Sequence, residues 1–186
     1  MKTLIMINGT QGSPLQHFSL VGLTFAHSDV TYMEPYTVTG PGDWSIFRGG
    51  AVFIEGAESV SLESCHFRKL NGNAVFFSGF VRNSSVVGSY FESIGDSCIA
   101  AIGNDPFHIN QTSGNFPQHN IISGNVFHSF GIFGKQTSAY FQSLAAHTTI
   151  DHNIIFNGPR AGVCFGTGFA GGNVRILLTN ASKRPF

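Results

Sequence analysis

"SLESCHF", residues 61–67, returns 24 residues later as "SVVGSYF", residues 85–91. The same pattern recurs as "SLVGLTF" (19–25), "IISGNVF" (121–127) and "TIDHNII" (149–155). Aligned on the last residue, the copies place an aromatic or aliphatic side chain in one column: Phe25, Phe67, Phe91, Phe127 and Ile155. Five residues earlier, each copy carries Leu, Val or Ile. Repetition at a fixed period is typical of a repeat protein.

A second apolar run follows each of these anchors. "AVFF", "CIAAI" and "GVCF" begin seven residues after Phe67, Phe91 and Ile155. "AVFI" (51–54) and "AYFQ" (139–142) match them once insertions are removed. The runs are short, rich in β-branched and aromatic residues, and bounded by Gly and Asn. No segment has a long apolar period of 3.6 residues, so the chain is predicted to be all-β.

A unit of this size cannot bury its own apolar face and has to stack on its neighbours. Equivalent strands then lie about 4.8 Å apart in parallel sheets. This arrangement stacks the Phe column inside and places Asn125 above Asn153 in a turn. A β-sandwich would also have frequent turns, but it gives no reason for agreement column by column. We therefore predict a parallel β-helix of about five to six coils.

Several longer stretches add a resemblance to this pattern: "GGAVFIEG", "GNAVFFSG", "IGDSCIAAIG", "KQTSAYFQ" and "NGPRAGVCFGTGFAGGN". Over residues 15–178 the chain resembles right-handed, single-stranded parallel β-helix proteins of the pectate-lyase-like superfamily. It is also similar to a branch of that superfamily near the β-helix glycoside hydrolases, family 141 among them. The resemblance implies right-handed coils and a protein that acts on polysaccharides or oligosaccharides.

The two ends of the repeat lead to a further expectation. Coils cover residues 15–178 of a single domain, residues 1–186, and complete caps are not seen in the sequence. We expect a fragment of a longer protein, with self-association through uncapped ends. The longer parent is expected to be extracellular or secretory, although "MKTLIMI" is not a clear signal peptide.

Composition excludes several classes of function. Charged residues make up 11% of the chain, against about 25% in ordinary domains, and ten basic residues balance ten acidic ones. Nucleic acid is therefore not an expected partner, and no apolar run is long enough for a membrane span. The acids are scattered, the eight histidines lack ligand spacing, and the glycines form no phosphate-binding loop. We predict neither a metal nor a cofactor.

Polar residues gather just before the second run of each repeat. They are Arg48, Asn71, Asp96, Lys135 with Gln136, and Arg160. Stacked coils would bring them onto one edge, flanked by insertions at residues 27–47, 103–117 and 132–137. Structural roles remain open for each residue: Asp96 as a turn cap, Arg160 in an ion pair, and Lys135 with Gln136 in a solvated loop.

The chemistry of this edge indicates glycoside hydrolysis, which needs two carboxyl groups. Asp96 is one, and Asp43 or Asp105 from the insertions is the candidate partner. Substrate-binding roles fall to the remaining polar residues: Arg160, Lys135, Gln136, Arg48 and Asn71. A polysaccharide lyase, with Arg160 and Lys135 as cation and base, is an alternative. A non-catalytic glycan-binding or inactive β-helix is another.

Alternation along the second runs places a further set of side chains outside the predicted coil. This stripe comprises Phe53, Phe76, Ala100, Phe141 and Cys164. Sugar rings stack on exposed aromatic stripes, but large bare apolar patches are uncommon. We therefore expect the insertion at 27–47, with Tyr36, Trp44 and Phe47, to cover it.

Overall fold

The computed structural model describes residues 1–39, 45–104, 114–166 and 174–177. All regular secondary structure in these ranges is β-strand, which confirms the predicted all-β class. No helix in the described ranges is long and apolar enough to cross a membrane.

The described residues form three parallel sheets and a separate two-stranded antiparallel sheet. Sheet A contains β1 (Ile5–Asn8), β7 (Val52–Glu58), β10 (Val75–Arg82), β13 (Ile99–Ile102), β16 (Ser138–Ser143) and β19 (Ala161–Gly166), with β2 (Leu15–Gln16) also paired to β7. Sheet B contains β3 (Ser19–Val21), β8 (Ser61–Glu63), β11 (Ser85–Val87), β14 (Ile121–Ser123), β17 (Thr148–Asp151) and β20 (Val174–Leu177). Sheet C contains β4 (Thr24–Ala26), β9 (His66–Leu70), β12 (Tyr90–Ile94), β15 (Val126–Phe130) and β18 (Ile154–Phe156).

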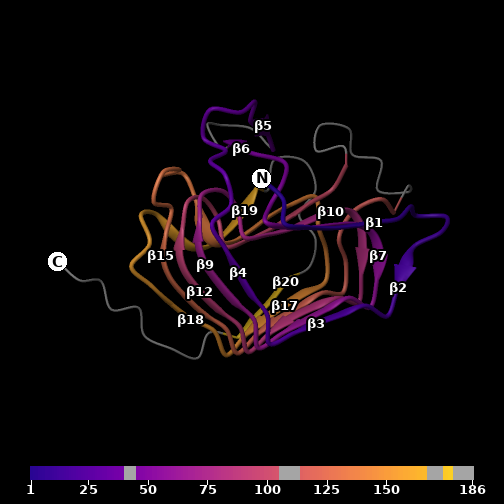
Figure 1. The fold of residues 1–186 in the computed structure, drawn as a ribbon. Coiled ribbons are helices and arrows are strands. Elements are labelled where there is room, and N and C mark those ends of the chain that lie inside the picture. The colour runs from indigo at the N-terminus through magenta and orange to yellow at the C-terminus, as the bar shows by residue number, and fades with distance from the viewer. Residues whose placement is uncertain (40–44, 105–113, 167–173, 178–186) are drawn as a thin grey trace.

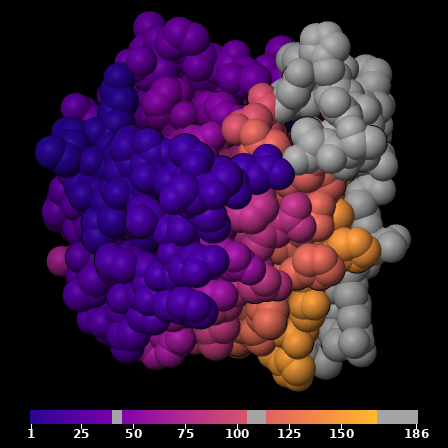
Figure 2. Space-filling model, turned by 90° about the vertical axis from the view of Figure 1, so that its right-hand side faces the viewer, coloured from indigo at the N-terminus to yellow at the C-terminus, as the bar shows by residue number. Residues whose placement is uncertain are grey.

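Consecutive repeats stack along one direction, because neighbours within each sheet come from successive repeats. Figure 1 shows equivalent strands lying one behind another on three sides of the molecule. In Figure 2 the chain advances across the molecule from its N-terminal part to the orange repeats. Stacked parallel strands of this kind are consistent with a β-helix, or solenoid.

The aligned Phe column is a stack of rings in the core, as predicted. Phe25 pairs with Phe67, Phe67 with Phe91, and Phe91 with Phe127. Their ring centroids lie 4.9, 4.5 and 4.7 Å apart. All four rings are buried, so the column supplies apolar burial in four successive repeats.

A two-residue turn joins each strand of sheet B to the following strand of sheet C. Its first residue has a positive φ, as at Gly88 (60°) and Gly124 (65°), a conformation that glycine adopts without steric cost. Its second residue forms the predicted ladder: Asn125 Nδ2 donates to Asn153 Oδ1 at 3.0 Å, and Asn125 Oδ1 accepts from the Ser89 N–H at 2.9 Å. These side chains satisfy backbone groups that have no strand partner.

The outward stripe of sheet A is covered, as expected. Ile46 packs with Phe76, Ala100 and Phe141 in a second apolar cluster, with Phe53 and Cys164 partly buried at its border. Ile46 belongs to β6 (Ser45–Ile46), which pairs antiparallel with β5 (Thr37–Val38) in the 27–47 insertion. The expected cover from Trp44 lies outside the described residues.

The stacked strands begin earlier than the sequence predicts. β1 pairs with β7, Ile5 opposite Val52 and Ile7 opposite Ile54, and so extends sheet A ahead of residue 15. The Phe-anchored pattern missed β1 because it places a strand of sheet A after each anchor, whereas β1 precedes the first anchor, Phe25. At the other end β20 pairs with β17, and the register sets residue Ile176 opposite Ile150.

Candidate functional site

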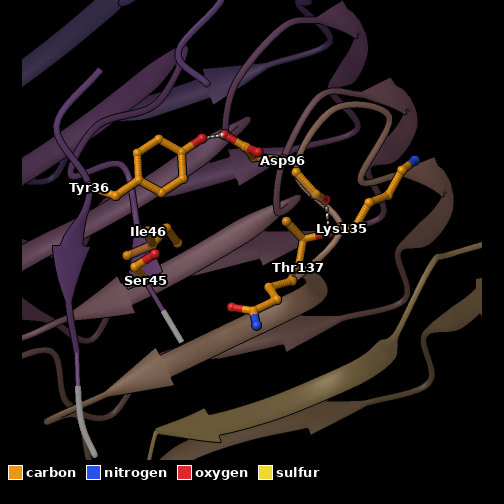
Figure 3. Close-up of a pocket in the computed structure, with 8 residues that line it drawn as sticks. Tyr36, Ser45, Ile46, Asp96, Lys135 and Thr137 are labelled. Carbon is orange, nitrogen blue, oxygen red and sulfur yellow. Dashed lines mark hydrogen bonds between the residues drawn. The ribbon is translucent and has the colours of Figure 1, made fainter. Parts of the chain in front are cut away.

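Asp96 lies in the turn between β12 and β13, where the chain passes from sheet C to sheet A. It is only 2% exposed. Its Oδ2 atom accepts hydrogen bonds from Thr31 Oγ1 at 3.0 Å and from the Tyr36 hydroxyl at 2.9 Å. Figure 3 shows the bond from Tyr36. Its Oδ1 atom is buried and has no hydrogen-bond partner among the described residues. One carboxyl oxygen is therefore held in place, and the other is left unsatisfied.

This environment favours the protonated form of Asp96. Burial raises the pKa of Asp96 above its ordinary value, whereas the hydrogen bonds from Tyr36 and Thr31 and the nearby Gly134 N–H lower it. The Gly134 N–H donates to Gly95 O at 3.1 Å and only passes near Asp96 Oδ1. Burial and the charge of Asp96 also raise the pKa of Tyr36, so the phenol stays protonated. A buried carboxyl that keeps its proton suits a proton donor.

The third insertion, residues 132–137, and the preceding Gly131 lie against the turn that carries Asp96. The N–H of Gly131 donates to Asp96 O at 3.1 Å, and the N–H of Phe133 donates to Gly95 O at 3.0 Å. A Cβ atom at Gly134 would collide with Asp96 Oδ1, so this approach of backbone to carboxyl requires glycine.

A pocket of about 260 Å³ opens beside Asp96. Its labelled lining in Figure 3 is Tyr36, Ser45, Ile46, Asp96, Lys135 and Thr137. Gly134 and Gln136 also line it. Lys135 Nζ donates to Gly131 O and Ile132 O, each at 2.9 Å, and the Lys135 side chain points away from Asp96 (Figure 3). The ammonium group of Lys135 is therefore hydrogen-bonded to the backbone of its own loop.

The side chains of Arg48 and Asn71 lie elsewhere. Arg48 donates to Ser78 Oγ at 2.8 Å and Asn104 Oδ1 at 2.6 Å, and its guanidinium carbon is 5.8 Å from the centre of the Phe76 ring. Burial lowers the pKa of Arg48, and the charge of Glu55 opposes this shift. Asn71 Nδ2 donates to Ser28 O at 2.8 Å. Arg48 therefore lies over the outer face of sheet A, and Asn71 anchors the 27–47 insertion through its hydrogen bond to Ser28.

The remaining predicted residues are Arg160, Asp43 and Asp105. Arg160 is exposed in the turn between β18 and β19, and the described pocket lining does not include it. Its charge is close enough to lower the pKa of the Cys164 thiol, which burial raises more strongly. Asp43 and Asp105 lie outside the described residues. Of the predicted site, the structure thus brings Asp96, Lys135 and Gln136 to one pocket.

Sequence reasoning missed Thr31 and did not assign Tyr36 to the site. Both hydroxyl donors come from the 27–47 insertion and reach Asp96 across 65 and 60 residues of sequence. The insertion has no counterpart in other repeats, so column alignment cannot place it. Among the described residues, no group of three or more His, Cys, Asp or Glu side chains is arranged to hold a metal ion.

Comparison with known proteins bears on the fold. No protein-family profile matches the chain, and no curated protein matches it by sequence. A solved structure described as a glycoside hydrolase superposes with a TM-score of 0.72 and 20% sequence identity. The match covers 89% of this chain and 34% of that protein, so this chain spans about a third of the length of its structural neighbour. The likeness shows a shared fold.

Proposed function

We propose that this chain is part of a right-handed, single-stranded parallel β-helix of the pectate-lyase-like superfamily. We further propose that it acts on polysaccharides as a glycoside hydrolase-like domain. The stacked parallel sheets and the fold of the neighbouring hydrolase support the architecture. Fold alone does not specify activity, so the proposal depends on the site.

The observation that carries the proposal is the buried Asp96 carboxyl beside the pocket. Its proton is retained to higher pH by burial, and its Oδ1 lacks a hydrogen-bond partner among the described residues. A glycosidase needs such an acid to protonate the oxygen that leaves as the glycosidic C–O bond breaks. Tyr36 and Thr31 hold the other carboxyl oxygen by hydrogen bonds and so orient Asp96 as a proton donor.

The second carboxylate of the reaction stays a prediction. Asp43 precedes pocket-lining Ser45 by two residues, and it is the candidate to activate water or attack the sugar. Asp105 follows Asn104 and is the other candidate. Lys135, Gln136 and Arg160 are proposed to contact the hydroxyl or acidic groups of the glycan.

The test compares Asp96→Asn with wild type on soluble xylan, arabinan, pectin and mixed-linkage glucan, with release of reducing ends as the readout. Asp96→Asn should reduce turnover at least about 100-fold, because it removes the proton donor. Asp151→Asn is the matched control, since Asp151 also has a buried Oδ1 without a partner among the described residues but lies in sheet B. Its turnover should equal that of wild type. An unchanged rate in Asp96→Asn would remove Asp96 from the mechanism.

A non-catalytic glycan-binding protein is the second candidate. Asp96 is the only carboxylate among the described residues that line the pocket, and one carboxyl is not enough for hydrolysis. Binding of a glycan without product release in the same assays would favour this alternative. A lyase has less support. Its candidate base is Lys135, and the ammonium group of Lys135 donates hydrogen bonds to two carbonyl oxygens of its own loop.

A further inference from the structure

Two exposed aromatic rings stand side by side beyond the pocket. Tyr32 and Phe133 come from different insertions, and their ring centroids are 5.7 Å apart at an interplanar angle of 33°. Tyr32 is 52% exposed and Phe133 is 45% exposed. Their sequence neighbours Met33 and Ile132 are also exposed, so the two loops present a group of large apolar side chains. Groupings of this kind usually mark a binding surface.

This aromatic pair is continuous with the candidate site. Tyr32 directly follows Thr31, whose hydroxyl donates to Asp96. Phe133 directly precedes Gly134, which lines the pocket and packs against Asp96 Oδ1. A ligand that extends from the pocket along these loops would therefore contact the two rings.

Both rings are carried on anchored backbone. The N–H groups of Ile132 and Phe133 donate to Ile94 O at 3.1 Å and Gly95 O at 3.0 Å. On the other loop, the Glu34 N–H donates to Thr31 O at 2.9 Å and closes a turn around Tyr32. Preorganised loops lower the entropy lost when a ligand binds.

A contrasting group of rings lies on the outer face of sheet C. There His128 and Phe156 are nearly parallel, at 5° and 5.1 Å, so each covers a face of the other. Each of these two rings therefore has one face covered by its neighbour. Tyr32 and Phe133 are tilted and about half exposed, which leaves ring surface for a partner.

We propose that Tyr32 and Phe133 form an aromatic subsite that stacks against a pyranose ring next to the sugar held in the pocket. This inference rests on the proposed function. A pocket of about 260 Å³ is small for a ligand cleft, so a longer glycan has to extend beyond it. The electron-rich face of an aromatic ring attracts the polarised C–H groups on the face of a sugar. The occupant of the exposed pair is thus an oligosaccharide of at least two units.

Titration calorimetry with xylohexaose, cellohexaose and hexagalacturonate tests the subsite. Tyr32→Ala and Phe133→Ala should each weaken binding of the oligosaccharide that wild type binds by about five- to tenfold. Phe133→Tyr keeps the ring and should bind like wild type, whereas Phe133→Leu keeps an apolar side chain but should bind as weakly as Phe133→Ala. Phe18→Ala is the matched control, because Phe18 is also 45% exposed but lies outside the pocket lining. Its affinity should not change.

The outcomes separate this inference from the proposed function. Wild-type affinity in both alanine variants, together with lost turnover in Asp96→Asn, would overturn the subsite and leave the hydrolase proposal standing. Equal affinity of Phe133→Leu and Phe133→Tyr would also overturn stacking, since only one of them retains a ring. Absence of both binding and turnover in wild type for all these glycans would overturn both. Circular dichroism of each variant confirms that the fold is retained.

Discussion

At the scale of single residues, Asp96 combines burial with incomplete hydrogen bonding. A carboxylate with a buried, unsatisfied oxygen is costly, and the protonated form relieves part of that cost. The hydroxyl groups of Thr31 and Tyr36 partly stabilise the charged form. The same contacts that orient Asp96 therefore also set the pH at which it loses its proton.

Stability should depend on pH through this residue. Because its folded-state pKa is raised, Asp96 contributes stability that is fully present below the unfolded pKa of about 4 and is lost as pH rises through the folded pKa. Asp96→Asn has no proton to lose, so the Tm of this variant relative to wild type should increase as the pH rises from about 4 through the folded-state pKa of Asp96. Thermal unfolding followed by circular dichroism measures the difference.

A second variant checks the direction of this effect. Tyr36→Phe removes a hydrogen bond that lowers the pKa of Asp96, so its Asp96 should keep the proton to a higher pH than in wild type. Parallel Tm curves for wild type and Asp96→Asn across the range would contradict the assignment.

At the scale of strands, the Phe column is a buried apolar contact between successive repeats in sheet C. Phe91 lies between Phe67 and Phe127, with centroids 4.5 and 4.7 Å away. The Phe91 ring is thus in contact with the repeat before it and the repeat after it. Loss of one ring should therefore weaken two contacts between repeats.

Phe91→Ala should lower the free energy of unfolding by about 3–5 kcal/mol, because it leaves a cavity in a closely packed column. Phe156→Ala is the control, since Phe156 ends the same sheet but points outward and is exposed. It should change stability by less than about 1 kcal/mol. Urea unfolding measures both variants, and equal losses would show that the column is not the core.

At the scale of the whole molecule, three sheets share one stacking direction, so each sheet has a strand at either end. β3 and β4 are the first strands of sheets B and C. Val21 on β3 is 57% exposed, and Leu23 beside β4 is also exposed. A strand that has a free edge and exposed apolar side chains tends to pair with another chain.

The 186-residue chain should therefore self-associate as its concentration rises. Val21→Lys should shift it toward monomer, because charge on an edge strand opposes pairing between chains. Val87→Lys, on the interior strand β11 of the same sheet, adds the same charge away from the edge and should leave association unchanged. Size-exclusion chromatography with light scattering gives the masses. Monomeric wild type at every concentration would show that the edge is protected.

The sequence by itself determined the repeat, the residues that stack and the class of fold. Phe25, Phe67, Phe91 and Phe127 recur at equivalent positions because every repeat buries its apolar side chain in the same way. The same periodicity located Asp96 before a second strand and placed the aromatic stripe on the outer side of the coil. Local pattern was sufficient for these features, since each repeat contacts mainly its neighbours.

Only the tertiary structure decided how the insertions meet the repeats. Thr31 and Tyr36 reach Asp96, Arg48 crosses the outer face of sheet A, and the ammonium group of Lys135 turns back to its own loop. None of these contacts follows the spacing of the repeat. An insertion has no equivalent in the next coil, so its side chains are placed by packing and hydrogen bonding across long sequence separations, which a periodic pattern does not encode.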